Sequence, residues 1–295
     1  MRYTRLTVVA ALASTTLALA LAPAAAAAPN YPVRHSLVEG ALASLADPSA
    51  PPPGVNVPCT PSAAHPRPVV LVNGTFANMT DDWSFLGPTL ANAGYCVYST
   101  PLGGDPHSVI QTIGPVAISA AQLASFVDGV RATTHSSTVD LVGHSQGGMI
   151  AEYYTKFLGS GKVSTVVGLS PTTHGTTLSG LATLAGFFPG ALDLVGTACP
   201  ACADQTPGSA VITRLNTGPV AQPGVRYTII ETRNEFVVTP AGTAAFIREP
   251  GVRNLWVQDF CFFDLVDHAS LSYDRTTGAL VANALDPAHP TAVGC

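Results

Sequence analysis

The stretch that decides the fold is TVDLVGHSQGGMIAEYY, residues 138–154. It starts with β-favouring residues, passes a serine flanked by two glycines, and continues directly into helix formers. A strand that turns sharply into a helix strains the residue at the corner and leaves room only for glycine where the chain passes its neighbours. The spacing of Gly143, Ser145 and Gly147 therefore predicts a tight strand-to-helix turn with a serine at its corner.

This turn favours nucleophilic catalysis by Ser145. The pattern G-x-S-x-G holds the serine Oγ above the end of a sheet, over the N-terminus of a helix. The backbone amide of Gln146 would then be free to donate to a developing oxyanion. A glycine-rich turn with an incidental serine is the alternative, but the flanking strand and helix patterns favour the catalytic interpretation.

The first 28 residues have the layout of a secretory signal peptide. Arg2 and Arg5 precede an apolar run, which ends in the small residues of PAAAAAP. A transmembrane anchor is the alternative, but the run is short and alanine-rich and lacks a basic flank after it. We therefore expect cleavage near residues 26–28 and a secreted, extracellular mature protein with no transmembrane segment.

The charge of the mature chain excludes one class of partner. Without Arg2 and Arg5, Lys+Arg falls from 13 to 11 against 18 acidic residues, a net charge of 11 − 18 = −7. Nucleic-acid binding needs clustered Lys and Arg, so it is not expected. The roughly 267 residues that remain suffice for one α/β domain, which we expect to be a monomer.

An even number of cysteines in an exported chain predicts disulfides. The CPAC sequence at 199–202 could instead be a redox pair or half of a metal site. However, it lies in a loop rich in Gly, Ala and Pro, and no second CxxC or nearby histidine pair completes a zinc set. We therefore expect a local disulfide there, and no metal or cofactor. The six cysteines are Cys59, Cys96, Cys199, Cys202, Cys261 and Cys295.

Strand patterns alternate with helical ones from residue 68 onward. The segment 114–134 has apolar residues at helical spacing, and strands apolar on both faces indicate a parallel sheet covered by helices on both sides. Proline-rich residues 29–66 are expected to form an arm on this single domain, and the long irregular region 171–208 a lid or pocket wall. The expected strands are 68–73, 95–99, 138–143, 163–170, 225–233 and 253–258.

A nucleophilic serine needs a histidine base, and in this fold class the chain order is Ser, acid, His. That order favours His268, in DLVDHASLSYD, although a helix-start histidine without a role is the alternative. Of the other histidines, four precede Ser145, one adjoins it and is expected to pack beside it, one follows with no acid between, and one lies among prolines near the C-terminus. These are His35, His65, His107, His135, His144, His174 and His289.

The acid is expected from ETRNEFVVTP, at the end of the strand 225–233, and Glu235 is the candidate. Glu231 would lie within the strand, and Asn234 carries no charge. Three aspartates lie near His268 in sequence, but closeness in sequence does not place a carboxylate behind the imidazole ring. They are Asp259, Asp264 and Asp267. A second oxyanion donor is expected in VLVNGTFANM, where Thr75 can present its amide and its hydroxyl.

Four motifs in this order resemble secreted bacterial lipases of the class 2 family and, more distantly, Candida antarctica lipase B. They are PVVLVNGTFANMTDDW, LVGHSQGGMIAEYY, TRNEFVVTP and CFFDLVDHASL, and the resemblance spans about residues 55–295. It implies an α/β-hydrolase fold with Ser145 as nucleophile, Glu235 as acid, His268 as base, and Thr75 with Gln146 as the oxyanion hole. These lipases usually have aspartate where Glu235 stands.

The resemblance also implies the pairing of the cysteines and the substrate. It pairs Cys59 with Cys96 and Cys261 with Cys295, which leaves CPAC to close on itself. It implies hydrolysis of triacylglycerols through an acyl-enzyme, at an oil–water interface. The apolar stretch 178–196 suits an acyl-binding wall or lid, or else an ordinary core helix. The alternatives are a short-chain carboxylesterase, a polyester hydrolase, and a non-catalytic binding protein on a hydrolase scaffold.

Overall fold

The computed structural model describes residues 1, 3, 30–177, 180 and 198–295. The predicted signal peptide and the apolar stretch 178–196 lie almost entirely outside the described residues. Within them, no helix is both long and apolar enough to cross a membrane.

The centre of the molecule is a sheet of six parallel strands in the order β2-β1-β3-β4-β5-β6. All six strands lie where the apolar runs predict them, and the α/β prediction is confirmed. Parallel neighbours need crossover connections, which helices supply here. The strands are β1 (Val69–Val72), β2 (Val97–Ser99), β3 (Val139–His144), β4 (Val163–Leu169), β5 (Arg226–Glu231) and β6 (Arg253–Trp256).

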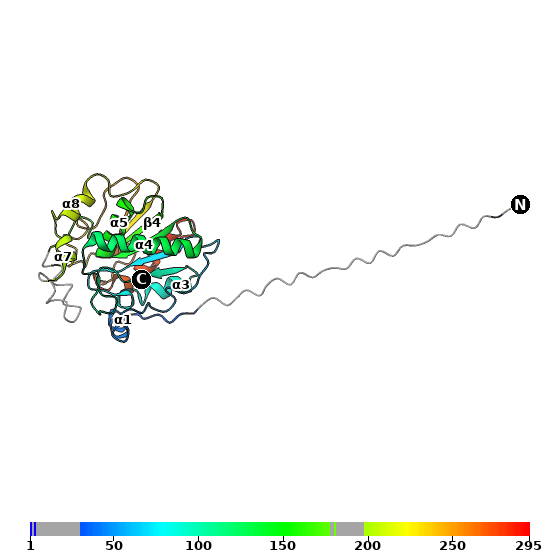
Figure 1. Ribbon diagram of the computed structural model, residues 1–295, viewed down its shortest axis with the longest axis horizontal. Helices are drawn as coiled ribbons and strands as arrows, with labels where there is room; N and C mark the ends of the chain where they lie inside the picture. Colours follow the sequence, from blue (N-terminus) through cyan, green and yellow to red (C-terminus); the bar gives the residue numbers. More distant parts are fainter. Residues whose placement is uncertain (2, 4–29, 178–179, 181–197) are drawn as a thin grey trace.

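Helices cover both faces of the sheet. One core contains α4 (Val116–Thr134), α5 (Gln146–Phe157) and α8 (Ala210–Asn216), and α4 crosses the middle of the molecule in Figure 1. The other core contains α3 (Leu86–Asn92) and α9 (Arg275–Leu285). The other helices of the described residues are α1 (Leu37–Ser44), α2 (Met79–Trp83), α7 (Pro200–Asp204), η2 (Val257–Asp259) and η3 (Leu271–Tyr273).

The alternation along β1 shows why the sequence requires both layers. Val70 and Val72 face the first core, whereas Val69 and Leu71 face the second, and all four are buried. The apolar positions predicted for the helix 114–134 are likewise buried in α4: Val116, Ala120, Leu123, Val127 and Val130.

The described part of the N-terminal arm, residues 30–66, contacts the edge of the sheet. Tyr31 and Asn92 exchange two hydrogen bonds, of 2.7 and 2.9 Å, between the arm and α3. Val55 pairs with Val97 of β2, which covers an otherwise open edge strand.

Three disulfides join the cysteines in the pairs that the resemblance implied. Cys59–Cys96 attaches the arm beside β2, and Cys199–Cys202 closes around α7. Cys261–Cys295 attaches the C-terminus to the chain just before His268. The first and third bridges each close a loop of more than thirty residues, so they restrict the unfolded chain more than the short one does.

Candidate active site

The strand-to-helix turn at Ser145 is as tight as the glycine spacing predicts. β3 ends at His144 and α5 begins at Gln146, so Ser145 alone forms the corner, with φ 53° and ψ −125°. A Cβ on Gly147 would lie 1.9 Å from the carbonyl oxygen of Val72 in β1. A Cβ on Gly143 would lie 2.4 Å from the backbone of Gly147. Only glycine at both positions lets the turn approach the neighbouring strand this closely.

The loop after β5 and the loop after β6 bring Glu235 against His268. Glu235 Oε2 accepts from His268 Nδ1 at 2.7 Å, and both side chains are fully buried. Glu235 Oε1 accepts from the amides of Val237 and Val238, at 2.6 and 2.9 Å. A backbone bridge between Asn234 and Asp267 joins the same two loops. The carboxylate is therefore held rigidly behind the imidazole ring.

The charged form of Glu235 is favoured despite its burial. Burial alone would raise the pKa of this carboxyl, but the charge and hydrogen bond of His268, together with the two backbone amides, lower it to about 2. The group is therefore a carboxylate at any pH near neutrality.

The competing carboxylates are engaged elsewhere. Glu231 accepts from Ser170 Oγ at 2.6 Å, and burial and the charge of Glu235 raise its pKa well above the usual value. Asp264 accepts from the amide of Val266, Asp267 accepts from the amide of Ser270, and Asp259 pairs with Arg233. Of the acids that the sequence offered, Glu235 is the one that reaches the ring.

Ser145 Oγ and His268 Nε2 are among the buried polar atoms that have no hydrogen-bond partner within the described residues, and Gln146 Nε2 and Glu231 Oε2 are two more in this region. Ser145 lines a small cavity together with Thr75 and Ala269, the residue after His268. A nucleophile and its base often form their hydrogen bond only when substrate binds. A serine hydroxyl and a histidine nitrogen that both lack a partner, one at the strained corner and the other on the ring held by Glu235, fit a nucleophile and its base.

The predicted oxyanion donors are adjacent, but the Thr75 hydroxyl has another role. Thr75 Oγ1 donates to Gln146 Oε1 at 2.8 Å and accepts from Gln205 Nε2 at 2.9 Å. The hydroxyl is thus used in a buried chain of side chains and is not directed at an oxyanion. The backbone amides of Thr75 and Gln146 are the remaining candidate donors; Gln146 is the first residue of α5, so its amide has no acceptor within the helix.

Sequence reasoning missed Gln205. It follows α7, and its side chain is fully buried, where it also donates to the carbonyl of Ala201 and accepts from Thr172. No motif marks this glutamine. The only signal was its position within 171–208, the region expected to line the pocket.

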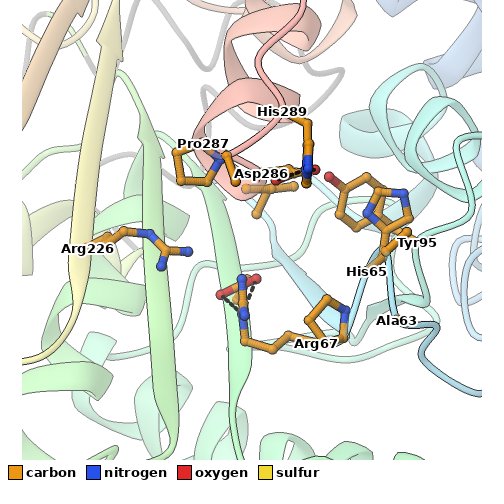
Figure 2. A pocket seen from close by; sticks show the side chains of 13 residues that line it. Ala63, His65, Arg67, Tyr95, Arg226, Asp286, Pro287 and His289 are labelled. Atoms are coloured by element: carbon orange, nitrogen blue, oxygen red, sulfur yellow. Dashed lines mark hydrogen bonds and ion pairs between the residues drawn. The ribbon is translucent and has the colours of Figure 1, made fainter.

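A second pocket lies at the amino ends of the strands, away from Ser145. Figure 2 shows Arg67 below it and Arg226 of β5 pointing in from the side. Arg67 donates to both carboxylate oxygens of Asp140, near the start of β3. Arg226 donates to Thr165 at 2.6 Å, and His289 lies within 3.1 Å of Asp286. Its two arginines, Arg67 and Arg226, are matched by two aspartates, Asp140 and Asp286, so the lining has no excess of either charge.

Curated relatives match part of the chain. Triacylglycerol lipases of Pseudarthrobacter phenanthrenivorans and Burkholderia plantarii are each 36% identical to it over 96 residues, or 31% of this chain. These matches span 28% and 25% of the two relatives, so the chain aligns with about a quarter of their length.

Solved structures show the same fold. Aspergillus fumigatus lipase B superposes with a TM-score of 0.63 at 21% identity, over 80% of this chain and 56% of that one. The mature Bacillus licheniformis lipase BlEst2 superposes with a TM-score of 0.55 at 17% identity, over 78% and 95%. The profile of the family described as Lipase (class 2) matches residues 66–252, more than half of the sequence. The chain therefore belongs to the class 2 lipase family and has its α/β-hydrolase fold.

Proposed function

We propose that the protein is a secreted serine hydrolase that cleaves carboxylic esters, with triacylglycerols as its substrate class. The observation that carries this proposal is the buried Glu235–His268 pair, whose free Nε2 lies in the same region as the strained Ser145. Membership of the class 2 lipase family and the names of the curated relatives support triacylglycerols. Three disulfides support export to an oxidising compartment.

In this mechanism Glu235 holds the proton on His268 Nδ1, so that Nε2 is the basic nitrogen. Nε2 takes the proton of Ser145 as Oγ attacks the ester carbonyl. The negative charge on the former carbonyl oxygen is stabilised by the amides of Thr75 and Gln146, each worth about 3 kcal/mol. The same proton then passes to the leaving alcohol, which departs from the acyl-enzyme. A water molecule, deprotonated by Nε2, then attacks the acyl carbon. The bond from that carbon to Ser145 Oγ breaks, Oγ takes back the proton from Nε2, and the fatty acid leaves.

The test is turnover by the mature, oxidised protein and its Ser145→Ala variant on tributyrin and triolein, each taken through its solubility limit. We expect Ser145→Ala to lose activity by at least about 10³-fold, with the thermal midpoint within about 2 °C of the wild type. Ser125→Ala, an exposed serine on α4, is the matched control and should keep full activity.

Each outcome has a definite meaning. Serine-dependent turnover that rises once triolein droplets form supports a lipase, whereas turnover of dissolved esters alone supports a short-chain esterase. Activity that persists in Ser145→Ala would show that the site is wrong. A wild type that hydrolyses neither ester would favour a polyester substrate or a binding protein on this scaffold.

A further inference from the structure

The histidine next to the nucleophile, His144, is buried between two hydrogen-bond acceptors. Its Nδ1 lies 2.8 Å from Asp82 Oδ1, and its Nε2 lies 2.9 Å from the main-chain carbonyl oxygen of His268. A neutral imidazole has one N–H, so it can donate to only one of them. With Asp82 ionised, both bonds form only if the ring carries a proton on each nitrogen. His144 and Asp82 are then a buried ion pair.

The other oxygen of the same carboxylate continues the chain of hydrogen bonds. Asp82 Oδ2 accepts from the amide of Gly74 at 2.8 Å, immediately before Thr75. Asp82 is itself held on α2, which begins with a capping box formed by Asn78 and Asp81. The chain therefore runs from Gly74 through Asp82 and His144 to the backbone of His268.

These bonds connect three segments that the proposed mechanism must hold in register. A Cβ placed on Gly74 would lie 3.3 Å from Ser145 Cβ and 3.5 Å from His144 Nδ1, so the oxyanion segment rests directly on the serine corner. The rings of His144 and His268 have centroids 5.1 Å apart. The Asp82–His144 pair thus includes the residue before Ser145. It contacts the backbone on both sides: Asp82 contacts Gly74, next to the candidate oxyanion donor Thr75, and His144 contacts the carbonyl of the candidate base, His268.

The surroundings favour the charged ring. Burial disfavours a charge on His144, but the charge and hydrogen bond of Asp82, the carbonyl of His268 and the charge of Glu235 together raise its pKa. Asp81 precedes Asp82 on α2 and is also buried. Burial and the charge of Asp82 raise the pKa of Asp81 well above the usual value and so favour its neutral form.

Stability alone does not explain this arrangement. Replacing a buried ion pair by apolar side chains of similar volume is often neutral or stabilising. We propose that Asp82 and His144 are positioning residues, whose ion pair fixes the Gly74–Thr75 backbone and the His268 backbone relative to Ser145. This inference rests on the proposed function, since it concerns the geometry of that same site.

The test compares kcat and KM on a soluble p-nitrophenyl ester for His144→Phe, Asp82→Ala and Asp82→Asn. We expect the first two to lower kcat by about 10²-fold, the effect of a displacement near 1 Å, with KM within about 3-fold. Asp82→Asn should recover most of that loss. Its Oδ1 can still accept from Gly74, and its Nδ2 can donate to a neutral His144 whose Nε2–H still reaches His268.

His174→Phe is the matched control. His174 follows the next strand, β4, and its two ring nitrogens also have partners, Asn216 Oδ1 at 2.6 Å and the carbonyl of Phe246 at 3.0 Å. The same substitution there should keep kcat within about 3-fold of wild type. A loss confined to His144 then separates positioning from the general cost of replacing a hydrogen-bonded histidine.

Nitrogen-15 NMR of the ring gives a readout that does not depend on turnover. We expect two N–H signals from His144 in the wild type at neutral pH, and one in Asp82→Asn. A single N–H in the wild type, full activity of His144→Phe, or equal losses in Asp82→Asn and Asp82→Ala would each overturn the inference. A wild type without Ser145-dependent turnover refutes the proposed function itself, whereas an active wild type with a fully active His144→Phe refutes only the positioning role.

Discussion

Glu235→Gln is the substitution that tests the proposed acid most directly, because the surroundings dictate how a glutamine would be oriented. Oε1 of Glu235 accepts from two backbone amides, those of Val237 and Val238. The NH₂ group of a glutamine cannot face two N–H donors, so its oxygen must stay there. Its nitrogen must then face His268 Nδ1, at the 2.7 Å contact that Glu235 Oε2 now makes.

A nitrogen donor at that position reverses the tautomer of His268. Nδ1 must accept, so the ring proton moves to Nε2, and Nε2 can no longer take the proton of Ser145. A wrong tautomer costs about 10⁴-fold in kcat in Ser-His-Asp enzymes. At about 1.4 kcal/mol per tenfold change, this corresponds to roughly 5 kcal/mol of barrier. We expect a loss of this size with little change in KM.

The assay is kcat on a soluble ester at pH 7 to 8, with Asp264→Asn and Asp267→Asn as controls. Asp264 accepts from the amide of Val266 at 2.9 Å, before His268, and Asp267 from that of Ser270 at 3.0 Å, after it. Both control variants should lose less than about 10-fold in kcat. If Glu235→Gln kept a tenth or more of wild-type kcat, or if either control lost more than it did, Glu235 would not be the acid.

Two further predictions concern stability. Burial raises the pKa of Glu152 on α5 to about 8 from 4.5, so its contribution to stability is present below about pH 4.5 and is lost as pH rises through 8. At pH 7 the wild type should have lost about 3 kcal/mol of its free energy of unfolding through Glu152, and Glu152→Gln should abolish this pH-dependent loss. The denaturant midpoint of the variant should therefore depend less on pH than that of the wild type. An equal dependence on pH would contradict the prediction. Gly147→Ala should destabilise by about 3 kcal/mol, because its Cβ would lie 1.9 Å from Val72 O, whereas Gly129→Ala on α4 meets nothing within 4 Å and should stabilise slightly.

The elements that the sequence predicted are those with a repeating pattern. Apolar runs predicted the central strands of the sheet, the shorter apolar segment at residues 253–258 predicted β6, and helical spacing predicted α4. The corner at Ser145 was predictable because only glycine tolerates the contacts that Gly143 and Gly147 make. In each case the cause is local, so a short stretch of sequence contains it.

The residues that the sequence did not reveal act through contacts between distant segments. Gln205 reaches Thr75 across 130 residues, and His144 reaches His268 across 124. Asp82 lies on α2, a helix of five residues that is too short to show a periodic pattern. Glu235 was the acid candidate from the sequence, but its position behind the ring, which Asp264 and Asp267 do not share, depends on contacts between the two folded loops.

The four buried carboxylates of this region follow one electrostatic rule. Asp81 and Glu231 lie beside Asp82 and Glu235, and in each case burial and the like charge raise the pKa of the carboxyl that has no histidine partner. The other carboxyl of each pair contacts a histidine: Asp82 contacts His144, and Glu235 contacts His268.

The proposed ion pair of Asp82 and His144 is neutral overall, so in the proposed mechanism the negative charge of Glu235 is left for His268 to balance. Protonation of His268 during attack by Ser145 supplies the missing positive charge. The imidazolium is therefore stabilised at the moment it forms, and the negative charge that balances it is already in place before the substrate binds.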